Sequence, residues 1–262
     1  MAKLLKGVVA VLFSLGGIDS GAQVKIDTDR PDQTESAATV PKNYFQAEIG
    51  FNKENTFYKN YDLVHPTALL KYGFNRWELR LETTARSTYE HLIPDPEWKS
   101  GFEPMEIGFK VALCEEKKWV PKTSLIIHAA LPNVASKSFQ TDHVAPSFRF
   151  TMQNSFTDNI GLGYNVGAEW DGFSTVPIWL YTFSPNFNIG EKWYAYVEAF
   201  GFMRRDEAPQ HNLDGGVAYY ISNDVKLDLS AGVGISKAAP KNYFALGCSF
   251  RICTKRQKEA SR

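Results

Sequence analysis

Long apolar runs are missing from this chain. Beyond Val8–Leu15, no stretch approaches the roughly 20 consecutive apolar residues that a membrane helix needs. Cysteine is scarce, and Cys114, Cys248 and Cys253 are an odd number without metal-type spacing. Free thiols or one Cys248–Cys253 bridge are therefore expected in place of a disulfide framework. An excess of one charge is missing too, because 29 basic side chains balance 29 acidic ones, and nothing indicates nucleic acid as a partner.

Histidine is also scarce, with five in the chain. His91, His143 and His211 belong to the side of the long connections, and none is spaced with a nucleophile, an acid or further ligands in a recognised way. His128 is expected to face an interior beside Ser124. We therefore predict no catalytic residue, no metal site, no cofactor and no enzyme.

The beginning of the chain has the pattern of an export signal. Lys3 and Lys6 precede the apolar run Val8–Leu15, and small residues at 20–22 precede Gln23. This pattern predicts a signal peptide over residues 1–22.

Alternation of charged and apolar residues is the main pattern in the rest of the chain. One such strand also fits a soluble sandwich, but the pattern recurs in segment after segment. With an apolar face on each strand and no helices to cover it, we predict that the apolar faces meet lipid and the charged faces line a wet interior. In residues 76–85 one phase holds Arg76, Glu78, Arg80 and Glu82, and the other holds Trp77, Leu79, Leu81, Thr83 and Ala85.

The strand count and the connections together predict the architecture. Short polar turns alternate with longer connections, of which Ser87–Glu103 is the longest. We predict an all-β fold: a transmembrane antiparallel up-and-down β-barrel of about twelve strands over residues 43–253, with periplasmic termini, in the outer membrane of a Gram-negative bacterium. The expected strands begin near Tyr44, Tyr61, Arg76, Met105, Thr123, Val144, Ile160, Pro177, Trp193, Leu213, Val225 and Tyr243.

Tryptophans are expected to mark the two membrane interfaces. Trp77, Trp119 and Trp193 each follow a tight turn, whereas Trp170 and Trp179 flank a connection on the opposite rim. Two interfacial girdles would have this distribution.

The inward phase supplies the candidate functional residues. They form either a structural lattice of ion pairs that fills the lumen or a constriction that selects solutes by charge, and the narrow bore of such a barrel favours the lattice. The lumen-lining set is Arg76, Glu78, Arg80, Glu82, Lys110, Arg149, Glu169, Glu198, Asp214 and Asp228.

A polar segment at residues 23–42 precedes the first strand and has no hydrophobic period. It is either a flexible periplasmic lead-in or a plug whose carboxylates pair with inward Arg80 or Arg149 in a partly desolvated lumen. Pro31 and Pro41 favour an extended path. The possible plug residues are Asp29, Arg30, Asp32 and Glu35.

Both ends of the mature chain resemble a known family. The segment Thr28–Ser36, followed by Val40-Pro41 and the strand Tyr44–Gly50, is similar to the start of outer-membrane transporters of the "Putative MetA-pathway of phenol degradation" family, common in Bacteroidetes-type bacteria. Residues 213–219, 225–232 and 244–251 are similar to the last three strands of that family.

The resemblance implies an outer-membrane channel or transporter for small solutes, with a link to aromatic or hydrophobic compounds. The alternative is a plugged barrel with a structural or surface-binding role and no transport. The expected partners are outer-membrane lipid, a small-molecule solute and the barrel assembly machinery. A basic tail at residues 254–262 departs from the usual aromatic terminus of such barrels, so Phe250 or Ile252 is expected to serve as the end signal.

Overall fold

A computed structural model of the chain describes residues 25–56, 60–91, 97–205 and 207–255. The signal peptide predicted for residues 1–22 and most of the basic tail lie outside these residues. Two 3-10 turns, Pro132–Val134 and Lys137–Phe139, lie in one connection. No helix in the described part of the chain is both long and apolar enough to cross a membrane.

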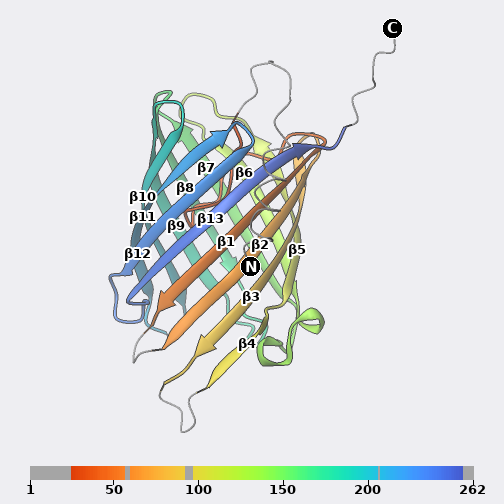
Figure 1. Cartoon of the computed structure of the whole chain (residues 1–262), viewed down its shortest axis with the longest axis vertical. Helices are drawn as coiled ribbons and strands as arrows, with labels where there is room; N and C mark the ends of the chain where they lie inside the picture. Colours follow the sequence, from red (N-terminus) through yellow and green to blue (C-terminus); the bar gives the residue numbers. More distant parts are fainter. Residues whose placement is uncertain (1–24, 57–59, 92–96, 206, 256–262) are drawn as a thin grey trace, which may run out of the picture.

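Twelve strands in the described residues close into one antiparallel ring (Figure 1). The ring closes where β1 pairs with β13, from Tyr44 opposite Cys253 to Asn55 opposite Asn242. The predicted antiparallel β-barrel is confirmed. Its strands are β1 (Tyr44–Asn55), β2 (Tyr61–Gly73), β3 (Trp77–Tyr89), β5 (Met105–Cys114), β6 (Lys122–Leu131), β7 (Ala145–Ser155), β8 (Ile160–Glu169), β9 (Ile178–Ile189), β10 (Trp193–Arg204), β11 (Gln210–Ser222), β12 (Val225–Gly234) and β13 (Asn242–Cys253).

A further strand, β4 (Trp98–Phe102), was not predicted. It lies in the connection expected over Ser87–Glu103 and pairs with the last five residues of β3, whereas the first half of β3 pairs with β5. The hairpin of β3 and β4 therefore projects beyond one rim, as Figure 1 shows. The connection is rich in proline and charged residues, so its sequence does not indicate a strand. The strand forms because pairing with β3 outweighs its weak local propensity.

The two faces of the wall differ as the alternation predicts. On β3, Leu79 is 45% exposed while its neighbours Glu78 and Arg80 are 0% and 1% exposed. On β12, Leu229 is 44% exposed between the buried Asp228 and Ser230. The interior is thus lined mainly by polar groups, and most large apolar side chains lie on the outer surface.

Strand β2 changes phase at a bulge. The pairing register with β3 shifts between Val64 and Thr67, so that inward positions are even-numbered before the bulge and odd-numbered after it. A bulge inserts one extra residue and so exchanges the two faces. As a result Lys71 points inward beside Arg80, its partner in the register.

Three tryptophans follow the prediction at the rim of the short turns. Trp77, Trp119 and Trp193 are 42%, 91% and 49% exposed. At the other rim, Trp179 is 52% exposed, but Trp170 lines an interior cavity, so its assignment to an outer girdle was wrong. Trp170 follows the last residue of β8, where the alternation ends, and its Nε1 donates to the carbonyl of Thr175 at 3.0 Å.

The outward phase can be tested at Leu229, in the middle of β12. Leu229→Arg places a cation against lipid and should destabilise the barrel by about 2–4 kcal/mol, whereas Leu229→Phe should leave its stability nearly unchanged. Urea titration of the folded, heat-modifiable band in lipid vesicles measures both variants. Equal stability of the two would show that this face does not meet lipid.

Candidate functional site

The segment over residues 25–42 lies inside the barrel. Ile26 N donates to the carbonyl of Asn223 at 2.7 Å, at the turn between β11 and β12, and Val40 N donates to Glu78 Oε2 at 2.6 Å. Asn43 then leads into β1 at the same rim. The segment therefore enters and leaves by the rim of the short turns and has its middle in the lumen.

Asp29 is the most heavily paired residue of this segment. Its carboxylate lies 2.8 Å from Lys71 Nζ, 2.8 Å from Arg80 Nη1 and 2.9 Å from Lys110 Nζ, and all four side chains are buried. Burial raises the pKa of Asp29, but Lys110, Lys71 and Arg80 outweigh it and hold that pKa well below its usual range. The carboxylate is thus held ionised among three cations from β2, β3 and β5.

Arg80 joins Asp29 to a second carboxylate of the segment. Its Nη2 lies 2.7 Å from Glu35 Oε2, and its Nη1 also lies 3.0 Å from Glu78 Oε1. Arg149 on β7 contributes a longer contact of 3.5 Å to Glu35. The segment's carboxylates thus contact the two arginines that the plug hypothesis named, Arg80 and Arg149.

Arg30 extends to the opposite wall. Its Nη2 lies 2.9 Å from Asp228 Oδ1 on β12. The guanidinium fits against Gly50 and Gly247, which are partners across β1 and β13. A Cβ at Gly50 would lie 2.1 Å from Arg30 Nη1, and one at Gly247 would lie 2.4 Å from its Nε, so only glycine leaves the space.

Wall side chains also bind the backbone of the segment. Glu48 Oε2 accepts from the backbone N–H groups of Asp29 and Arg30 at 3.0 and 3.1 Å. Asn165 on β8 pairs with both the N–H and the carbonyl of Glu35. Because buried backbone groups need partners, these bonds fix a segment that has no secondary structure of its own. Further bonds run from Gln33 N to Glu198, from Lys226 to the Arg30 carbonyl and from Ser124 to the Ala37 carbonyl.

The segment separates two cavities. The larger, about 750 Å³, opens among the long connections, and the smaller, about 340 Å³, lies among the short turns. Arg30, Asp32 and Glu35 line both of them, so the segment forms the wall between them. We call the larger cavity the vestibule.

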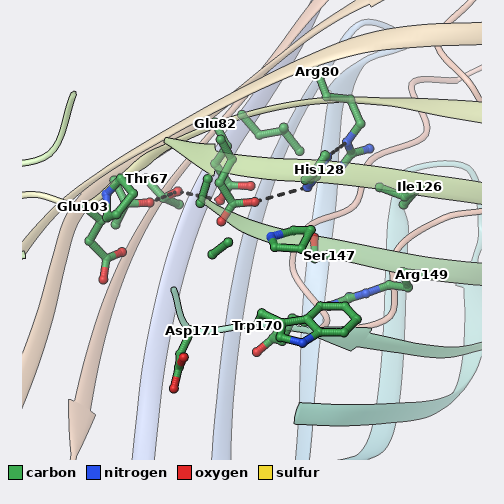
Figure 2. A pocket seen from close by; sticks show the side chains of 18 of the residues that line it. Thr67, Arg80, Glu82, Glu103, Ile126, His128, Ser147, Arg149, Trp170 and Asp171 are labelled. Atoms are coloured by element: carbon green, nitrogen blue, oxygen red, sulfur yellow. Dashed lines mark hydrogen bonds and ion pairs between the residues drawn. The ribbon is translucent and has the colours of Figure 1, made fainter. Parts of the chain in front are cut away.

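The vestibule has charged and apolar walls (Figure 2). Glu82 on β3 accepts a hydrogen bond from Thr67 at 3.1 Å, and His128 lies between Arg80 and the acidic side. Trp170 faces these groups across the cavity in the same view. Inward apolar side chains Leu69, Ile126 and Leu180 complete the lining.

The other lumen-lining candidates divide into two groups. Glu169 lines the vestibule, and Asp214 is buried on β11, where it accepts from Tyr196 Oη at 3.2 Å. Arg76 differs: it is exposed in the turn before β3, and its Nη2 donates to backbone carbonyls of Ala112 and Leu113. β3 begins at Trp77, so the alternation of that strand does not extend to Arg76. Arg76 is therefore not part of the buried cluster.

Sequence reasoning did not assign Lys71 to the site. The bulge in β2 exchanges the two faces ahead of Lys71, so an uninterrupted alternation over Tyr61–Gly73 could not place it. Counting the phase backward from the tight turn at Phe74 would have paired it with inward Arg80. The Glu48 side chain points inward from β1, but no residue pattern reveals which backbone N–H groups it binds.

Within the described residues, cysteine and histidine side chains form no disulfide and no metal site. Cys114, Cys248 and Cys253 are free thiols. His128 and Ser124 are both buried and inward, as expected. Within the described ranges, no three or more His, Cys, Asp or Glu side chains are grouped so that they could hold a metal ion.

The model of the family described as "Putative MetA-pathway of phenol degradation" matches residues 28–252. The chain belongs to this family. The match begins at Thr28 and thus includes most of the lumenal segment as well as the barrel, which confirms the resemblance seen at both ends of the sequence.

Solved structures share the fold. An outer membrane channel from Pseudomonas putida F1 is 8% identical, with 90% of this chain and 100% of that chain covered at a TM-score of 0.65. The NanC porin is 9% identical (79% and 100% covered, TM-score 0.53), and the KdgM porin is 10% identical (78% and 98% covered, TM-score 0.52). No curated protein sequence matches the chain. The similarity of fold to an outer membrane channel and to two porins confirms the predicted outer-membrane type of barrel.

The importance of the central ion-pair cluster can be measured at Asp29. Asp29→Ala leaves three buried cations without their shared partner, a change that costs roughly 3–5 kcal/mol for a buried pair. We expect residues 25–40 to become accessible to protease while the barrel stays heat-modifiable. Asp158→Ala, in an exposed turn, is the matched control and should leave the segment protected. Protection of the segment in both variants would show that Asp29 does not anchor it.

Proposed function

We propose that this protein is an outer-membrane channel for small solutes and that residues 25–40 are its plug. The observation that carries the proposal is the pair of cavities on either side of the segment, which share Arg30, Asp32 and Glu35 as lining residues. A barrel whose lumen is hollow on both sides of a single peptide segment has a path that displacement of the segment would complete.

The same geometry bears on the kind of solute. A cavity of about 750 Å³ is in the usual range for small-molecule sites. Inward Ile126, Leu180 and Trp170 give it apolar surface beside its charged groups. Together with the family's description, this mixture supports small aromatic or otherwise amphiphilic compounds as solutes, and it supports no catalytic role.

The alternative is a permanently plugged barrel with a structural or surface-binding role. The number of buried ion pairs on Asp29 and Arg80 favours it, because each must be broken before the segment moves. Recognition by the barrel assembly machinery through Phe250 or Ile252 stays a prediction under both functions.

We further propose that the rim of the short turns, with both barrel ends, is periplasmic. In a variant whose three native cysteines are serine, Lys99→Cys on β4 should be labelled on whole cells by an impermeant thiol reagent. Asn159→Cys, in a short turn, should be labelled only after the outer membrane is opened. Reversed labelling would invert the orientation. The serine background is needed because Cys253 is exposed.

Permeation is tested by deleting residues 24–38 behind an intact export signal. The deletion joins the two cavities and should raise single-channel conductance and the uptake of small aromatic solutes by vesicles at least severalfold. Heat-modifiable folding should be retained, because strands β1 to β13 are unchanged.

A shortened protein that folds and conducts no better than the parent would favour the structural barrel. The control is the full-length chain carrying Asn75→Ala, which changes an exposed turn outside both cavities and should conduct like the parent.

A further inference from the structure

His128 contacts the arginine that anchors the plug. On adjacent strands β3, β5 and β6, Arg80, Gly108 and His128 stand in one register row. Arg80 Nε lies 2.9 Å from His128 Nε2, and both side chains are buried. The contact spans β5, which pairs with β3 on one side and β6 on the other. Figure 2 shows the two labelled side chains joined by a dashed line.

Gly108 makes this contact possible. A Cβ at Gly108 would lie 2.1 Å from His128 Cδ2 and 2.2 Å from the carbonyl of Ile127. Any side chain there would push the imidazole away from Arg80. Glycine at position 108 thus leaves the space in which the imidazole ring of His128 crosses β5.

The proton positions follow from the donors. The Nε of arginine always carries a hydrogen and never accepts, so Nε2 of His128 must be the acceptor. The ring proton then lies on Nδ1, which faces Glu106 Oε2 at 3.2 Å. Only a neutral imidazole meets both conditions, because an imidazolium donates at both nitrogens.

We propose that His128 is a pH-sensitive latch of the plug. In its neutral form it holds Arg80 in place against Asp29 and Glu35, and on protonation it loses the contact with Arg80 and turns toward Glu106. The plug is then less firmly held at low pH. This inference rests on the proposed function, because it assigns a regulatory contact to the segment that the function assumes to move.

Charged groups from each neighbouring element line the vestibule together with His128 or, in the case of Lys110, contact the plug residue Asp29. Besides Arg80, β3 contributes Glu82, β5 contributes Glu106 and Lys110, β7 contributes Arg149, and the plug contributes Asp29 and Glu35. The carboxylates Glu82 and Glu106 offer the imidazolium partners on the vestibule side. The guanidinium on the other side repels it, so protonation changes the partner of the ring.

Other groups of the plug titrate differently. Burial opposes the ionisation of Asp29 and Glu35, but the surrounding cations lower the pKa of both below its usual range, so they stay ionised in mildly acidic solution. Burial raises the pKa of Asp32 to about 7, against the opposing effect of Lys226. Asp32 therefore needs its own control.

The test compares pH 7.5 with pH 5.5, between which histidine ordinarily changes charge. A spin label at Lys25→Cys, in the cysteine-free background, reports release of the plug, and vesicle conductance reports opening. The parent should show roughly tenfold more released plug at pH 5.5, the effect of losing one charge-assisted hydrogen bond. His128→Gln keeps an acceptor for Arg80 and a donor for Glu106, so it should stay latched at both pH values.

The controls isolate His128. His211→Gln, which removes a histidine bonded to Tyr181, and Asp32→Asn should both keep the full pH response. An unchanged spin label in the parent, or the same response in His128→Gln, would overturn the latch. If the parent releases its plug at pH 5.5 without conducting, and the protein lacking residues 24–38 does not conduct either, the latch is kept and the channel is rejected.

Discussion

The ionised carboxylate of Asp29 is the constraint on which the interior depends. Three cations from β2, β3 and β5 converge on it in a space that excludes most water, where an unpaired charge is costly and a paired one is strongly bound. Without the segment, Lys71, Arg80 and Lys110 would keep only the wall carboxylates Glu48 and Glu78 and would lose the carboxylate that all three contact. The lumenal segment therefore completes the electrostatics of the wall as well as occupying its bore.

Ion pairs join the segment to opposite walls of the barrel. The inward faces of the strands carry both signs of charge: Glu78 lies beside Arg80 on β3, and Lys226 lies near Asp228 on β12. Asp29 and Glu35 of the segment form ion pairs with the wall cations, and Arg30 forms one with Asp228. These ion pairs on opposite walls hold the segment across the lumen.

The sequence was enough to predict most of the barrel, because period-two alternation is a direct readout of a wall with one apolar face. It also named Arg80 as a partner of the segment, since a carboxylate in the lumen must find an inward cation. It could not place Lys71, whose phase depends on a bulge, or the short strand β4, which exists only through its pairing with β3. Nor could it reveal the space above Gly50, Gly108 and Gly247, because the need for glycine arises from side chains distant in the chain.

The seam between β1 and β13 has a consequence for assembly order. The segment is covalently joined to β1, the first strand, yet Arg30 binds Asp228 on β12, which is complete only when the last part of the chain has arrived. The part of the binding site that holds Arg30 is therefore incomplete until the sheet has closed on itself. We therefore expect complete docking of the segment to follow closure of the seam.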